Sequence, residues 1–151
     1  MIALLSERPD AIPALAAGYR AEWGDWYGPQ GPGVAEADLW ERAGVGPMPF
    51  GVVALENGLA IGTAAATAAS IASRAHLSPW LTGLWVAPEY RGHGVAGRLI
   101  DALVAEAARR GIGVLFTATE NGRALFVRQG WRFIENANED GHRLAVLAVE
   151  P

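Results

Sequence analysis

The stretch VAPEYRGHGVAGRLIDALV, residues 86–104, decides the fold of this chain. It passes from an apolar run through a proline and clustered glycines into a segment whose apolar residues recur at helical spacing. These residues are Leu99, Ile100, Leu103, Val104 and Ala107, followed by Arg109 and Arg110 at the negative end of the helix and by Gly111, which stops it. The stretch therefore predicts a strand, a glycine turn and an amphipathic helix.

The glycine turn between this strand and this helix suits an anion. The first N–H groups of a helix have no intrahelical partner, and the helix N-terminus carries about half a positive charge. Gly92 and Gly94 permit positive φ and close backbone approach, Ala96 leaves the first turn uncrowded, and Arg91 adds a planar cation. A pyrophosphate is a natural occupant of such a turn.

The same turn also fits a dinucleotide fingerprint. GHGVAG, residues 92–97, satisfies GxGxxG, and Glu120 lies far enough downstream to contact a ribose. In dinucleotide-binding folds, however, the glycines directly follow the first strand. Here APEYR intervenes and the turn lies in the second half of the chain, which disfavours a nicotinamide or flavin site.

The composition excludes several classes of function. The 151 residues include no cysteine, which rules out disulfides, thiolate nucleophiles and sulfur-ligated metals, and we predict no metal site. A net charge of −4 disfavours nucleic-acid partners. Residues 1–5 are too short for a signal sequence, and no uncharged run supplies the roughly 20 apolar residues of a membrane span. We expect one cytoplasmic domain over residues 1–151 without a membrane partner.

The rest of the sequence predicts an α/β (α+β) fold with a mixed central sheet of about seven strands, flanked by about four helices. Asn57-Gly58 indicates a tight hairpin turn, and the Ala-rich residues 64–72 are expected to continue its second strand into a loop. Asp10 can cap the first helix, and Trp40 and Trp131 are expected in the core. Strands are expected at 1–5, 50–55, 59–63, 80–86, 114–117, 131–135 and 143–149, helices at 11–22, 35–43, 95–110 and 121–129, and a polar turn at 136–141.

The run LWVAPEYRGHGVAGRLIDAL, residues 84–103, resembles the acetyl coenzyme A (acetyl-CoA) binding segment of the GNAT superfamily of N-acetyltransferases. Arg91, Gly94 and Ala96 occupy the fixed positions of the family motif, which is Arg or Gln, two residues, Gly, any residue, then Gly or Ala. ALFVRQGWRF, residues 124–133, resembles the family's last helix and its Gly-aromatic turn. The resemblance covers residues 81–133 and implies a GNAT-like fold.

The resemblance implies a ternary complex in which acetyl-CoA is the co-substrate. The backbone of residues 84–86 would hold the acetyl-pantetheine arm, and the N–H of Val86 would act on the thioester oxyanion. The glycine turn would bind the pyrophosphate, and the last helix would add further contacts. The implied cofactor-binding residues are Leu84, Trp85, Val86, Arg91, Gly92, His93, Gly94, Val95, Ala96, Asn121 and Phe126.

The catalytic groups of the family are not all present. An alkylamine acceptor has a pKa of about 10.4 and must lose a proton before it can attack. The usual places of the family's strand glutamate hold Trp80 and Thr82, and Phe126 replaces its general-acid tyrosine. Glu22 and His76 are candidate bases, and the alternative for each is a solvated surface residue.

Aromatic residues gather where an acceptor would enter. Trp23, Trp26 and Tyr27 follow the first helix, close to four acidic residues, Glu22, Asp25, Glu36 and Asp38. Aromatic faces and carboxylates suit a cationic amine. The alternative is that the two tryptophans anchor the first helix on the sheet.

These features predict an N-acetyltransferase that moves an acetyl group from acetyl-CoA to a primary amine of a small molecule by direct attack. The alternative is a noncatalytic module that binds an acyl-CoA and reports it to a protein partner. The family resemblance is also compatible with a homodimer. It leaves open the identity of the acceptor and of the general base and acid.

Overall fold

The computed structural model describes residues 1–151 and contains a seven-stranded sheet in the order β1-β2-β3-β4-β5-β7-β6. The strands are β1 (Ile2–Leu4), β2 (Phe50–Glu56), β3 (Leu59–Thr67), β4 (Trp80–Val86), β5 (Leu115–Thr119), β6 (Arg132–Glu139) and β7 (His142–Val149). Neighbouring strands are antiparallel except for β4 and β5, which are parallel. The expected mixed sheet and number of strands are confirmed.

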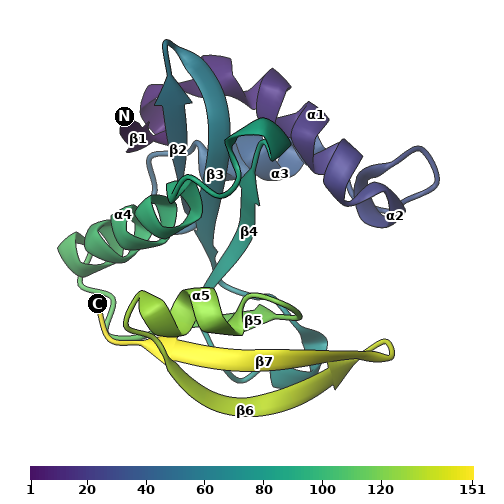
Figure 1. Cartoon of the computed structure of the whole chain (residues 1–151), viewed down its shortest axis with the longest axis vertical. Coiled ribbons are helices and arrows are strands. Elements are labelled where there is room, and N and C mark those ends of the chain that lie inside the picture. The colour runs from purple at the N-terminus through teal and green to yellow at the C-terminus, as the bar shows by residue number, and fades with distance from the viewer.

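Five helices flank the sheet: α1 (Ile12–Glu22), α2 (Gly24–Tyr27), α3 (Ala35–Arg42), α4 (Val95–Arg109) and α5 (Arg123–Arg128). Successive residues of β2 face opposite sides of the sheet. Val52 and Ala54 pack in one core cluster with α4, whereas Val53 and Leu55 pack in another with α1 and α3. The helices therefore cover both faces of the first half of the sheet (Figure 1). None of them combines the length and the apolar character that a bilayer crossing requires.

The hairpin between β2 and β3 turns at Asn57 and Gly58, whose φ angles of 50° and 80° are both positive, as the sequence predicts. β3 then runs through the Ala-rich segment to Thr67. The alanines at residues 64–66 are fully buried. Pairing with β2 and β4 therefore overrides the helical propensity of alanine.

The beginning of α1 differs from the expectation. Asp10 does not cap the helix, because it lies within a short 3-10 turn, Pro9–Ala11, and Ala11 takes the N-cap position; its carboxylate accepts a hydrogen bond from Arg8 Nη2 at 2.8 Å. α1 begins at Ile12 without any side-chain cap, and Pro13 lies harmlessly in its first turn. A local ion pair has therefore replaced the expected capping contact.

Two further expectations were wrong. Trp40 is 57% exposed, because it lies about 100° around α3 from the buried Leu39, whereas Trp131 is buried as expected. The polar turn expected at residues 136–141 shrinks to Asp140 and Gly141, since β6 and β7 extend across most of it. Backbone pairing over this segment outweighs its polar composition.

Gly18, in the middle of α1, lies against the ring of Trp85 on β4. A Cβ atom at this position would overlap the indole ring. Gly18→Ala is therefore expected to destabilise the fold by about 1–3 kcal/mol through overpacking, although alanine normally stabilises a helix by about 1 kcal/mol over glycine. The change in Tm on thermal unfolding shows whether Gly18→Ala destabilises or stabilises the fold. Gly113→Ala, at an open loop position, is the control. A raised Tm for Gly18→Ala would show that α1 does not pack this closely on β4.

Candidate active site

An opening in the sheet separates β4 from β5. The two parallel strands pair only at Trp80 and Phe116, so beyond this point they diverge (Figure 1). The second half of β4 keeps β3 as its neighbour on one side and has no strand on the other. Its backbone groups on that side are therefore accessible to a ligand.

Val86, at the end of β4, directs its backbone toward this opening. The next residue, Ala87, donates its N–H to Ile61 at 2.8 Å and so faces β3. Successive peptide groups of a strand point to opposite edges, which turns the N–H and C=O of Val86 away from β3. Its carbonyl accepts a hydrogen bond from Arg91 Nε at 2.9 Å. The N–H of Val86 thus lies where the resemblance requires a donor for the thioester oxygen.

A bulge in β4 bends the strand just before Trp85 and Val86. Thr82 pairs with Ala65 and Trp85 with Thr63, so β4 holds one residue more than β3 between these pairs. Gly83 accommodates the bulge with a φ of 63°.

The bulge is held from α1 and α3 through Tyr19. The Tyr19 hydroxyl donates to the carbonyl of Gly83 at 2.7 Å and accepts from Arg42 Nη1 at 3.0 Å. Burial raises the pKa of Tyr19 to about 12, against the opposing charge of Arg42, so its hydroxyl remains a donor at neutral pH. This chain of two hydrogen bonds fixes the strand that carries Val86.

The glycine turn has the geometry of an anion site. Gly92 and Gly94 have φ angles of 79° and 81°, and α4 begins at Val95 with no side-chain cap. The amides of residues 92–97 donate to no group of the protein, and the first hydrogen bond of α4 runs from Arg98 to the carbonyl of Gly94. These N–H groups are therefore available to an anion.

A groove of about 430 Å³ connects this turn with the end of β4. It brings together seven of the expected cofactor residues, which are Leu84, Trp85, Val86, Arg91, Gly92, Gly94 and Ala96. It also contains residues that the sequence analysis did not single out, Tyr90, Gly97, Leu125 and Arg128. Arg128 was missed because no local pattern connects it with the glycine turn more than 30 residues earlier, and only the fold brings it to the groove.

The other expected cofactor residues do not line the groove. The side chain of Val95 is buried in the core, so only its backbone amide belongs to the turn. Phe126 is also buried and packs edge-to-face on Trp131, with ring centroids 5.1 Å apart. His93 is exposed, with Nδ1 2.9 Å from the carbonyl of Arg91, and Asn121 is exposed before α5.

The side chain of Arg91 turns toward α1. Besides the carbonyl of Val86, its guanidinium contacts the carboxylate of Glu22 in an ion pair. It therefore links the end of β4 to the end of α1 along the wall of the groove. Glu22 lies at the border between the groove and a second cavity, since it lines both.

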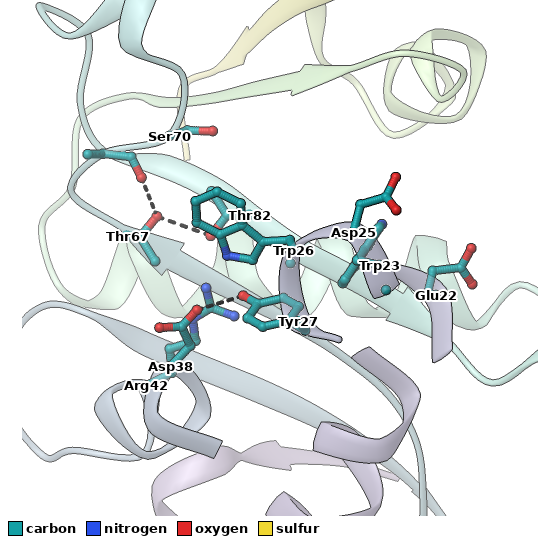
Figure 2. A pocket seen from close by; sticks show the side chains of 13 residues that line it. Glu22, Trp23, Asp25, Trp26, Tyr27, Asp38, Arg42, Thr67, Ser70 and Thr82 are labelled. Carbon is teal, nitrogen blue, oxygen red and sulfur yellow. Dashed lines mark hydrogen bonds between the residues drawn. The ribbon is translucent and has the colours of Figure 1, made fainter. Parts of the chain in front are cut away.

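The second cavity has a volume of about 690 Å³ and adjoins β4 at Thr82 and Gly83, just before the residues of this strand that line the groove. Its walls come from the end of α1, α2, α3 and the neighbouring strands β3 and β4 (Figure 2). The lining residues are Glu22, Trp23, Gly24, Asp25, Trp26, Tyr27, Asp38, Arg42, Thr67, Ala69, Ser70, Thr82 and Gly83. The expected aromatic and acidic group is thus assembled here, except for Glu36, which pairs with Arg20 on the surface.

Polar side chains inside this cavity are linked in two groups. Thr67 and Thr82 lie with their hydroxyl oxygens 3.0 Å apart, and Thr67 donates to the carbonyl of Ala69. Because that bond uses the proton of Thr67, the hydroxyl of Thr82 donates to Thr67. Opposite them, Tyr27 donates to Asp38 at 2.6 Å, and burial, followed by this hydrogen bond, raises the pKa of Tyr27 (Figure 2).

The two candidate bases are placed very differently. Glu22 reaches both the groove and the cavity. His76 is exposed on the loop before β4 and lines neither of them. Of the two, only Glu22 lies at the border between the groove and the second cavity.

Comparisons with known proteins agree with this geometry. The sequence model described as "Acetyltransferase (GNAT) family" matches residues 15–131, whereas no curated protein matches the chain significantly. An aminoglycoside 6'-N-acetyltransferase complexed with coenzyme A superposes with a TM-score of 0.79 at 15% identity, over 99% of this chain and 96% of the other.

Two further solved structures have the same fold. A ribosomal-protein-alanine N-acetyltransferase from Brucella melitensis gives a TM-score of 0.75 at 21% identity, over 100% of this chain and 99% of the other. A protein from Salmonella typhimurium, solved with its cofactor acetyl-CoA, gives 0.72 at 17% identity, over 99% and 92%. The family match spans most of the chain and includes both the glycine turn and the end of β4. The chain belongs to the GNAT acetyltransferase family.

Proposed function

We propose that this protein transfers the acetyl group of acetyl-CoA to a primary amine of a small molecule by direct attack in a ternary complex. The observation that carries the proposal is the meeting of the groove and the cavity at Glu22 and Trp23, beside the free edge of β4. A thioester in the groove and an amine in the cavity would approach each other at this border. No covalent enzyme intermediate is needed, which suits a chain without cysteine.

The groove fits the cofactor in its charges and in its shape. The free amides of residues 92–97 suit the pyrophosphate, and Arg128 adds a cation to the same groove. The N–H of Val86 would then donate to the thioester oxygen, where negative charge develops during attack. Structures of the same fold solved with coenzyme A or acetyl-CoA support this choice of co-substrate.

The cavity fits a small amine. Its volume of about 690 Å³ suits a small molecule better than a folded protein surface. Asp25 and Asp38 supply negative charge, and Trp23 and Trp26 supply aromatic faces. The aminoglycoside 6'-N-acetyltransferases of the same fold also support a small-molecule acceptor.

Glu22 is the proposed base. It accepts the proton of the acceptor ammonium directly or through water, while Arg91 orients its carboxylate. Thr82, in place of the family's strand glutamate, can accept a hydrogen bond from the amine but cannot hold its proton. Phe126 is buried and has no proton to donate, so the leaving thiolate takes its proton from water or another residue, or leaves unprotonated by virtue of the thiol's own modest pKa.

Glu22→Gln is expected to lower kcat about 100-fold at neutral pH, because the amide cannot take up the proton. Raising the pH should restore part of the rate, since a larger fraction of the amine is then already neutral. Steady-state kinetics over a pH series measure both effects. Glu36→Gln, which removes a carboxylate from another ion pair with arginine, is the control. An unchanged kcat with an unchanged pH profile would exclude Glu22 as the base.

A second candidate function is a noncatalytic acyl-CoA sensor, which the buried Phe126 and the hydroxyl of Thr82 favour. Release of free thiol, measured against a panel of amines, separates the two functions. The chain contains 12 arginines and no lysine, so acetyl groups from labelled acetyl-CoA cannot accumulate on lysine side chains of the protein itself. Acetyl-CoA binding without turnover of any amine would support the sensor.

A further inference from the structure

Arg42 provides a positive charge inside the second cavity, which we call the acceptor cavity. Its guanidinium has no carboxylate partner there. Arg42 is the only basic residue among those that line the cavity, and it is half-buried at the end of α3. Its single hydrogen bond in the protein runs from Nη1 to the hydroxyl of Tyr19 at 3.0 Å. Asp38, one turn earlier, forms its hydrogen bond with Tyr27 instead. Most of the N–H groups of this guanidinium therefore have no protein acceptor.

The guanidinium lies next to Gly83, just before the residues of β4 that line the groove. A Cβ atom built on Gly83 would come within 2.7 Å of Arg42 Nη1, so the two groups are adjacent. Gly83 belongs to the bulge that directs Leu84 and Val86 into the groove. A group bound by Arg42 would consequently lie close to the attacking amine.

The charges of the cavity indicate what this group is. A guanidinium disfavours a nearby ammonium ion, so a simple alkylamine gains nothing from Arg42. A carboxylate, in contrast, matches the planar fork of N–H donors and can accept two hydrogen bonds from it. Asp25 and Asp38 supply the opposite charge for the amino end of the acceptor.

We propose that Arg42 binds a carboxylate that lies next to the amine of the acceptor, as it does in an α-amino acid. This inference rests on the proposed acetyl transfer to a small amine. Arg42 is then the residue that determines specificity. Acceptors without the carboxylate bind more weakly because they leave the guanidinium unpaired in a partly desolvated wall.

The test compares pairs of acceptors that differ only in the carboxylate: phenylalanine with 2-phenylethylamine, tryptophan with tryptamine, and lysine with 1,5-diaminopentane. The wild-type protein should show the higher kcat/KM for at least one amino acid over its matched amine. Arg42→Gln should lower this ratio about 10- to 100-fold, through a higher KM for the amino acid. The amine of the same pair should change much less.

Tyr19→Phe is the matched control. It removes the same hydrogen bond to Arg42 but leaves the guanidinium charge in place. It is expected to lower kcat for both members of a pair alike, so that the ratio stays near that of the wild type. Equal losses for both members in Arg42→Gln would overturn the inference, because Arg42 would then act only through the bulge.

A binding measurement separates this inference from the proposed function. Calorimetry in the presence of coenzyme A compares N-acetylphenylalanine with N-acetyl-2-phenylethylamine, and needs no turnover. Tighter binding of the carboxylate, lost in Arg42→Gln, supports the inference even if no amine is acetylated. Acetylation of amines with no advantage for the carboxylate in either measurement refutes the role of Arg42 and leaves the acetyl transfer standing.

Discussion

Gly94→Val is expected to raise the Kd for acetyl-CoA at least about 100-fold, which is the loss of one or two hydrogen bonds to a charged group. Gly94 precedes α4 with a φ of 81°, a conformation that a β-branched residue rarely adopts. A side chain there also stands at the amides to which the pyrophosphate would bind. Isothermal titration calorimetry measures the affinity, and circular dichroism checks that the variant is folded.

The control for this substitution lies at the other end of the same helix. Gly111 has a φ of 75° and no atoms close to its missing Cβ, so Gly111→Val introduces similar backbone strain far from the groove. It should lower the Tm while leaving the affinity for acetyl-CoA unchanged. If both variants bind acetyl-CoA as tightly as the wild type, the pyrophosphate does not occupy the glycine turn.

Gly83→Val is expected to lower kcat at least about 100-fold, the cost of a displacement of about 1 Å at a reacting centre. The new side chain would clash with the hydroxyl of Tyr19 and lie against Arg42 Nη1, at a φ of 63° that already excludes valine. The bulge would have to straighten, which moves the N–H of Val86 away from the opening. Steady-state turnover below the Tm of the variant measures the effect.

Gly58→Val separates this effect from general strain. Gly58 lies in the β2–β3 hairpin turn with a φ of 80° and open space around it. The variant should lose stability but keep its kcat at a temperature where it is folded. A Gly83→Val protein that is folded and turns over at the wild-type rate would mean that the bulge does not position the acetyl donor.

The parts of the molecule that were predictable are those encoded by neighbouring residues. The glycine turn, the apolar face of α4 and the Asn57-Gly58 hairpin each depend on a few adjacent positions, and the structure contains all three as the sequence predicts. The strand over residues 64–66 was expected from its place after the hairpin and not from composition. Local backbone preferences therefore explain most of the fold.

The acceptor cavity was predictable only in part, because its contacts join distant positions. Tyr19 and Gly83 are hydrogen-bonded although 64 residues separate them, and no local pattern indicates the pair. Arg42 lies two residues after Trp40, whose burial was predicted wrongly, on the short helix α3. Only Ala35 and Leu39 of this helix are buried, so its sequence does not show which side faces the cavity. Phe126, expected beside the cofactor, packs in the core because α5 presents Leu125 to the groove.

The groove and the acceptor cavity are lined by different parts of the polypeptide. The walls of the acceptor cavity come from residues 22–83, whereas the groove, apart from Glu22 and Trp23, is lined by residues 84–128. Under the proposed function, mutations in the first half of the chain can therefore alter acceptor choice while donor recognition is retained. Evolution could diversify one partner of the reaction without rebuilding the other, and a chimera joined at the β4 bulge would inherit its acceptor from one parent and its donor site from the other.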